Sequence, residues 1–154
     1  MATDKRIDPF RGFNFRLEID GLPVAGFSEV SGLTIDRDAT DYREGTDKTN
    51  LVRKLAGLTK VVALVAVRGT TQDDTLWRWH ERLARGVDDR RSGSLVLMNE
   101  AHKDVIRWNF ENGILTKLEG PAVKASDNAV AVERMEIVHE GLTMELEPAP
   151  SPVA

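Results

Sequence analysis

The sequence has no cysteine in its 154 residues, which excludes disulfide bonds and thiolate chemistry. It has no apolar run close to the roughly 20 residues that a membrane-spanning helix needs, so no membrane insertion is expected. It also lacks a basic excess, because 21 Lys and Arg stand against 25 Asp and Glu. A dedicated nucleic-acid binder needs such an excess to displace counterions from phosphates. The composition therefore favours neither a membrane protein nor a nucleic-acid binder.

A secretory signal is missing as well. Residues 1–11 carry several charges and no apolar run follows them, unlike a signal peptide. We therefore expect the chain to be made and assembled in the cytoplasm.

Convergent catalytic groups are also missing. His80, His102 and His139 fall on a predicted helix, a turn and a strand, so their spacing predicts no metal site. His80-Glu81 begins like the zinc-protease helix motif, but Ala84 occupies the position of its second histidine. No phosphate-binding loop or nucleophile elbow is present. We expect no catalytic residue, no metal and no cofactor, and hence no enzyme.

Alternating strands dominate the patterns that are present. Phe13, Phe15, Leu17 and Ile19 alternate with polar residues, which predicts a strand with one buried face. The same reasoning predicts strands over residues 24–30, from Leu33 and Ile35 to Tyr42, over 94–98 and over 106–114. In the strand over 106–114, Asn112 and Ile114 should lie on the apolar face. Residues 129–147 should form one bent strand or two short ones. The strands at 94–98 and 106–114 should form a hairpin.

One segment has helical periodicity. Leu76, Trp79, Leu83 and Val87 recur at helical spacing, with Trp77 widening the apolar face. Carboxylates at the start, cations at the end and Gly86 after the last turn support a helix over about residues 73–85. We expect both tryptophans to pack in the core rather than to stack on a sugar or a base.

Two segments between residues 45 and 68 depart from simple alternation. Residues 45–57 are mostly polar and bounded by glycines, which predicts an extended surface loop. Residues 60–68 contain an uninterrupted apolar run, which predicts one strand covered on both faces, by the core and by a helix or another subunit.

Together these elements predict a mainly β fold, a β-barrel of two packed antiparallel sheets with one α-helix. We expect a single domain over residues 1–147. Residues 148–154 contain three prolines and are expected to form a flexible C-terminal tail.

Several segments, which keep the family's order along the chain, resemble the tail-tube family of contractile phage tails and extracellular contractile injection systems. They are Asp8-Pro9, Phe13-Asn14-Phe15, Ile19-Asp20-Gly21-Leu22, residues 25–33, Tyr42-Arg43-Glu44-Gly45, Arg53-Lys54-Leu55, Gly57-Leu58, Arg68-Gly69, Leu76-Trp77 with Trp79, Trp108-Asn109-Phe110 and His139-Glu140-Gly141-Leu142. An ordered series over residues 8–142 is specific although each member is short.

This resemblance implies a structural subunit that forms hexameric rings, which stack into a hollow tube inside a sheath. The implied partners are further copies of the chain, the sheath protein, the baseplate or spike, the tube terminator, and cargo effector or DNA in the lumen. The finished tube would belong to a phage-like particle or virion tail. Because head-to-tail contacts propagate, stacked rings would extend into a filament.

The resemblance also assigns the subunit interface to the family's extended hairpin loop. The predicted interface residues are Tyr42, Arg43, Glu44, Lys48, Asn50, Arg53, Lys54 and Leu55. Their cations could meet acidic residues such as Glu29, Asp36, Asp38 and Asp41 of an adjoining subunit. Three alternatives remain: a tube-initiating baseplate paralogue, a ring protein of the type VI secretion kind, and a monomeric ligand-binding β-barrel.

Overall fold

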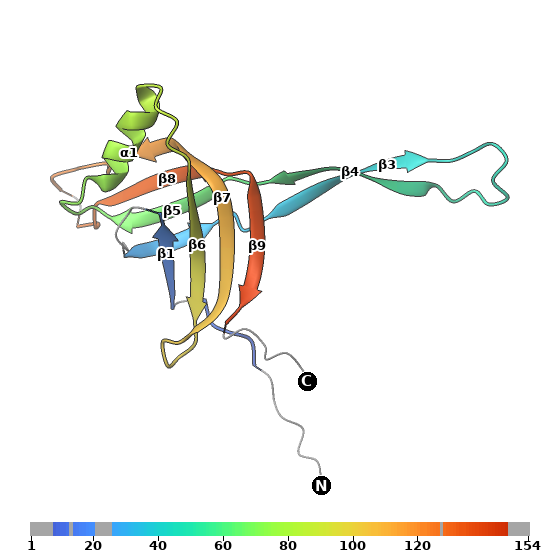
Figure 1. Cartoon of the computed structure of the whole chain (residues 1–154). Helices are drawn as coiled ribbons and strands as arrows, with labels where there is room; N and C mark the ends of the chain where they lie inside the picture. The colour runs from blue at the N-terminus through green and yellow to red at the C-terminus, as the bar shows by residue number, and fades with distance from the viewer. Residues whose placement is uncertain (1–7, 13, 21–25, 127, 148–154) are drawn as a thin grey trace, which may run out of the picture.

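The computed structural model describes residues 8–12, 14–20, 26–126 and 128–147, which fold into nine strands and one helix (Figure 1). The predicted C-terminal tail, Phe13 and the start of the predicted second strand lie outside these residues. The elements are β1 Phe15–Ile19, β2 Phe27–Ser31, β3 Ile35–Tyr42, β4 Arg53–Val61, β5 Leu64–Gly69, α1 Thr75–Ala84, β6 Arg91–Met98, β7 Asp104–Glu119, β8 Val132–Val138 and β9 Gly141–Leu146. The predicted mainly β fold with one helix is confirmed.

Two antiparallel sheets share the long strand β7. The first sheet consists of β1, β6, the first part of β7, and β9. The second sheet consists of β2, β5, β8 and the part of β7 from Ile114 onward. The predicted segment 129–147 forms two strands, β8 and β9. Strand β8 pairs with the last part of β7 and β9 with its first part, so the two strands belong to different sheets.

The core lies between the two sheets and under the helix. Leu17, Leu95 and Phe110 of the first sheet join Leu64 and Met135 of the second in one buried cluster. A side chain buried from both sides in this way contributes about 1.5–3 kcal/mol to folding. The predicted inward face of β1 is therefore correct, since Leu17 and Ile19 are both buried.

The helix closes one end of this core. Trp79 is fully buried, and its Nε1 donates to the backbone oxygen of Asp89 at 2.8 Å. Gly86 has a φ of +84°, the left-handed conformation expected after the last turn. The predicted core positions of Trp77 and Val87 are wrong, because these residues are 39% and 44% exposed. The apolar stripe of the helix narrows to Leu76, Trp79 and Leu83. In the described residues, no helix is long and apolar enough to cross a membrane.

A bulge in β7 changes which of its residues face the core. Gly93 pairs with Phe110 whereas Arg91 pairs with Gly113, so β7 contains one extra residue between these pairs. Asn112 takes a φ of +53° there, which asparagine tolerates better than most residues. The predicted apolar face is correct as far as Phe110 and wrong beyond it, because Gly113 and Leu115 are buried in place of Asn112 and Ile114.

Strands β3 and β4 leave the body as a two-stranded arm (Figure 1). All of β3 is exposed, and so is β4 except for its last residue. The prediction of a loop over residues 45–57 is wrong from Arg53 onward, because those residues pair with β3. The predicted single strand over residues 60–68 is also wrong, because β4 ends at Val61 and β5 begins at Leu64. Residues 62 and 63 separate the two strands, where the chain passes from the arm into the second sheet.

Candidate assembly interface

The arm carries all eight predicted interface residues on its outer half. Tyr42 ends β3, Arg53 to Leu55 begin β4, and the other four lie in the connection over residues 43–52. All eight are exposed. The structure thus brings them together at one projecting surface, and their role in subunit contacts remains a prediction.

The tip of the arm is held in a defined turn by Asp47. Its carboxylate accepts from the Glu44 backbone N–H at 3.0 Å and lies 3.4 Å from the Arg53 guanidinium. Arg43 donates to the backbone oxygens of Thr49 at 3.1 Å and Asp47 at 3.3 Å. Arg43 and Arg53 therefore shape the tip itself, and Asp47, which the sequence reasoning did not select, organises it.

Ion pairs within the arm involve acidic residues that we expected to meet a neighbouring subunit. Lys54 pairs with Asp41, and Lys60 pairs with Asp38 at 3.4 Å. Exposed pairs of this kind contribute at most about 1 kcal/mol each. They favour the arm's own strand register and leave little reason to expect strong binding from these charges alone.

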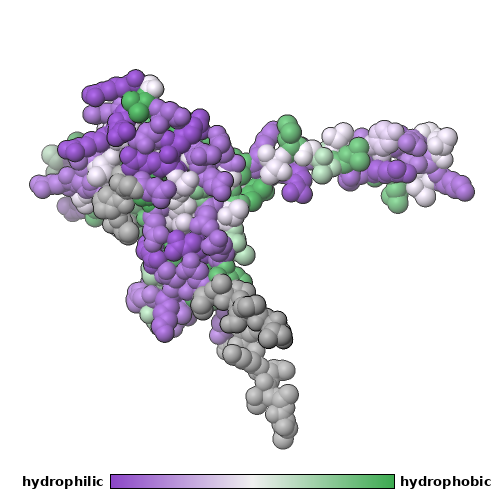
Figure 2. Space-filling view, in the orientation of Figure 1, coloured by the Kyte–Doolittle hydropathy of each residue, from purple (hydrophilic) through white to green (hydrophobic). Residues whose placement is uncertain are grey.

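The arm also carries apolar side chains that no other part of the subunit covers. Figure 2 shows hydrophobic patches along an otherwise polar projection. The large exposed apolar residues of the arm and its tip are Ile35, Tyr42, Leu51, Val52, Leu55 and Leu58. Apolar groups this numerous on a thin ribbon have no core of their own, which makes the arm a candidate interaction surface.

The root of the arm is fixed by backbone packing and a buried histidine. Gly32 has a φ of +98°, and a Cβ at this position would lie 2.2 Å from the Ala63 oxygen. His139, almost fully buried, places Nε2 3.1 Å from the Val62 oxygen and Nδ1 2.9 Å from the Gly141 oxygen. This ring links the base of the arm to the turn between β8 and β9, a role that its isolated place in the sequence did not reveal.

The first sheet has one polar face and one apolar face. The paired residues Arg16, Val96, Arg107 and Glu145 form one polar row, and the next polar row is Glu18, Ser94, Asn109 and Thr143. The rows that alternate with them are apolar: Phe15, Leu97, Ile106 and Leu146, then Leu17, Leu95, Trp108 and Met144. The face turned to the viewer in Figure 2 is accordingly hydrophilic over these strands.

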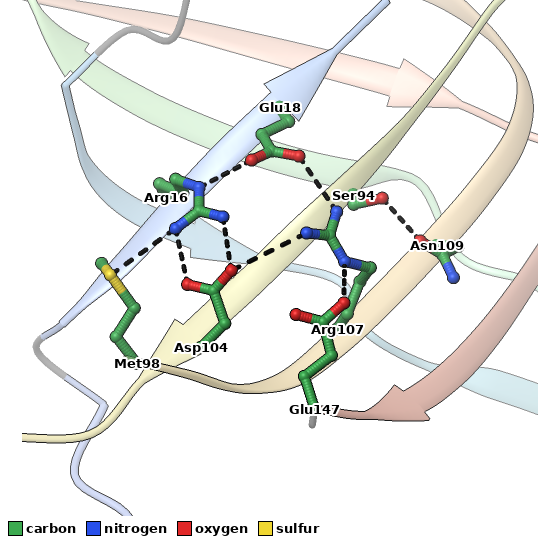
Figure 3. A network of polar contacts seen from close by, with 8 residues as sticks. All are labelled: Arg16, Glu18, Ser94, Met98, Asp104, Arg107, Asn109 and Glu147. Atoms are coloured by element: carbon green, nitrogen blue, oxygen red, sulfur yellow. Dashed lines mark hydrogen bonds and ion pairs between the residues drawn. The ribbon is translucent and has the colours of Figure 1, made fainter. Parts of the chain in front are cut away.

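Ion pairs connect the side chains on the polar face of the first sheet (Figure 3). Arg16 donates to both oxygens of Asp104 at 2.7 Å and to Glu18 at 2.6 Å. Arg107 donates to Glu18 at 3.0 Å and to Glu147 at 2.7 Å. Val96 lies between the two arginines in its row and is fully buried, so their aliphatic stems cover it. The network thus joins β1 and β7 to Glu147, the residue that follows β9.

The arginines shift the titration of these carboxyl groups. Hydrogen bonds from Arg16 lower the pKa of Asp104, and those from Arg16 and Arg107 lower the pKa of Glu18. A hydrogen bond to Asp104 is likewise the main reason that the pKa of Arg16 is raised. The charged forms of all three groups are thus stabilised in the folded protein.

We predict that the unfolding free energy of the Asp104→Asn variant decreases less on acidification than that of the wild type. The folded pKa of Asp104 lies below its unfolded value of about 3.9, so its contribution is present above that pH and is lost as the pH falls through the folded pKa. Urea unfolding of the unassembled protein at pH 7 and pH 3 should show a smaller difference in unfolding free energy for Asp104→Asn than for wild type. The exposed control Asp88→Asn should match wild type. Equal differences for Asp104→Asn and wild type would contradict the role given to this network.

The first sheet is open at both edges. Among the described strands, β1 pairs only with β6, and β9 pairs only with β7. On β9 the apolar residues Met144 and Leu146 are 57% and 51% exposed. Open edges with apolar residues favour pairing with another strand.

Within the described ranges, no group of three or more His, Asp or Glu residues is placed to hold a metal ion.

Comparisons with known proteins agree with this architecture. The family described as T4-like virus tail tube protein gp19 matches residues 11–143. No curated protein matches the chain.

Solved structures share the fold. A chain of an extracellular contractile injection system, the PVC sheath-tube complex in the extended state, superposes with a TM-score of 0.80 and 22% identity, over 90% of this chain and 92% of that chain. A chain of the anti-feeding prophage baseplate gives 0.80 and 20%, over 90% and 97%. Hcp1 from Flavobacterium johnsoniae gives 0.57 and 15%, over 86% and 94%. At these identities the likeness shows a common fold.

Proposed function

Because the chain belongs to the T4-like virus tail tube protein gp19 family, we propose that it is the structural subunit of the inner tube of a contractile injection device. Six copies form a ring, and rings stack into a hollow tube that conducts cargo or DNA. The tube lies inside a sheath and ends at a baseplate and a terminator, the surroundings named for its structural neighbours. The work of such a subunit is mechanical rather than catalytic.

The observation that carries this proposal is the pair of open edges on the first sheet. Its four strands run antiparallel, so β9 of one subunit and β1 of the next also run antiparallel when the two edges meet. Repetition around a ring closes the sheet and removes every free edge. The polar face, with its ion-pair network, then lines the channel, while the apolar rows face the second sheet. Met144 and Leu146 become covered at the seam.

Charging this seam should block assembly. We predict that Met144→Lys folds normally but requires a protein concentration higher by at least about tenfold to form rings, because the buried ammonium costs more than about 1.4 kcal/mol per contact. Sedimentation velocity over a concentration series measures the shift, and circular dichroism checks the fold. Met144→Leu, which keeps an apolar side chain at this position, should assemble like wild type. Rings that form equally well with lysine at residue 144 would rule out a β9 to β1 seam.

A second candidate is a subunit that begins the tube at the baseplate. The chain superposes on the anti-feeding prophage baseplate chain with the same TM-score as on the sheath-tube chain. Such a subunit would form single rings, whereas the main tube subunit forms long tubes. In either role we infer that the chain is made and assembled in the cytoplasm and acts as a single domain.

A further inference from the structure

The arm tip presents an apolar side chain on a fixed turn. Leu51 is 79% exposed, and Val52 beside it is also exposed. Before this pair, Arg43 donates to the Thr49 backbone oxygen at 3.1 Å, and directly after it the Arg53 guanidinium lies 3.4 Å from the Asp47 carboxylate. A side chain displayed in this way loses little conformational freedom when it enters a pocket, which favours binding.

A pocket lies in the connection between β7 and β8. Its volume is about 310 Å³, and its lining contains four alanines, the valines Val123 and Val130, and Lys124. Both valines are strongly exposed, so they offer apolar surface that the subunit leaves open. A leucine side chain matches the chemistry of this lining, and the carboxylate of Glu44 at the arm tip complements Lys124.

The tip and the pocket stand at opposite ends of the second sheet. The arm continues from the Leu64 end of β5, whereas Gly69 at its other end pairs with Val132, which directly follows the pocket. Figure 1 shows the arm and the connection between β7 and β8 pointing away from each other. The two surfaces cannot meet within one chain, but they can meet between copies arranged head to tail.

We propose that the arm tip of one subunit inserts Leu51 into the alanine-lined pocket of another copy of the chain. This inference rests on the proposed tube function and adds a receptor site for the arm. The contact is heterologous, with a donor and an acceptor surface on every subunit, so it propagates along an assembly.

Disulfide cross-linking tests the contact directly, because the chain has no cysteine of its own. Two separately purified variants, Leu51→Cys and Val130→Cys, are mixed, assembled and mildly oxidised. Mixing single-cysteine variants ensures that every heterodimeric disulfide joins two subunits. We expect such dimers to form roughly tenfold faster than with the control pair Leu51→Cys and Val138→Cys, because assembly raises the local thiol concentration only at a true contact. Val138 is exposed and lies on β8 at the arm end of the sheet.

The outcomes separate this inference from the proposed function. Tubes that form without selective cross-linking overturn the tip-to-pocket contact and leave the tube function intact. Absence of any assembly by wild-type protein overturns both. If Val130→Cys itself prevents assembly, the pair Val52→Cys and Val123→Cys repeats the test within the same two surfaces, and the same two results decide it.

Discussion

A variant without the outer arm should fold normally and fail to assemble. Arg37 and Thr59 pair directly across the arm, so residues 38–58 can be replaced by the two-residue turn Asn-Gly without changing the register at the root. No arm residue belongs to the buried core cluster, so we expect the thermal unfolding of the body to change little. The deletion removes five of the six large exposed apolar side chains on the arm, and assembly should be lost completely.

Electron microscopy and sedimentation velocity measure this effect, with circular dichroism as the check on folding. The control is the double variant Asp38→Asn and Lys60→Gln, which keeps the full arm and removes one exposed ion pair. It should assemble, because such a pair contributes at most about 1 kcal/mol. Tubes of normal length from the shortened protein would show that the arm has no part in assembly.

The Arg68→Ala variant should cause the largest loss of stability in the body. Arg68 is 3% exposed, and its Nε lies 3.1 Å from the carboxylate of buried Glu133. It also donates to Asp73, in front of α1, through Nη1 at 3.3 Å and Nη2 at 3.2 Å. Removing the guanidinium leaves Glu133 buried without a cation and releases the start of the helix from β5. We expect the unfolding free energy to fall by about 3–5 kcal/mol, measured by urea denaturation.

A compensating double variant separates the charge effect from lost packing. Arg68→Met with Glu133→Leu replaces the buried pair by apolar side chains and should recover most of the stability lost in Arg68→Ala. The hypothesis of an uncompensated buried charge fails if the double variant is as unstable as the single one. It also fails if Arg68→Ala loses less than about 1 kcal/mol.

Elements with one buried face were predictable from the sequence because burial imposes a periodic pattern. Strand β1 alternates around Leu17, and α1 carries Leu76 and Trp79 at helical spacing, and both predictions are confirmed. The resemblance in the ordered segments led to the tail-tube family, which the match over residues 11–143 confirms.

Elements without a buried face left no such pattern. Strand β4 is exposed on both sides, so its polar and apolar residues follow no period, and its first part, residues 53–57, was predicted as a loop. The apolar run over residues 60–68 conceals the break between β4 and β5, since valine suits the root of the arm as well as the core strand. The bulge at Asn112 depends on a positive φ, and the alternation of polar and apolar residues in the sequence does not indicate such a backbone conformation. These are features of tertiary placement, and the pocket between β7 and β8 is another.

Negative-stain electron microscopy of the purified wild-type protein tests the tube assignment most directly. The open edges of the first sheet and the apolar surface of the arm predict rings with a central channel, stacked into tubes as the protein concentration rises. Particles that remain single subunits at high concentration, with an intact fold by circular dichroism, would contradict the assignment.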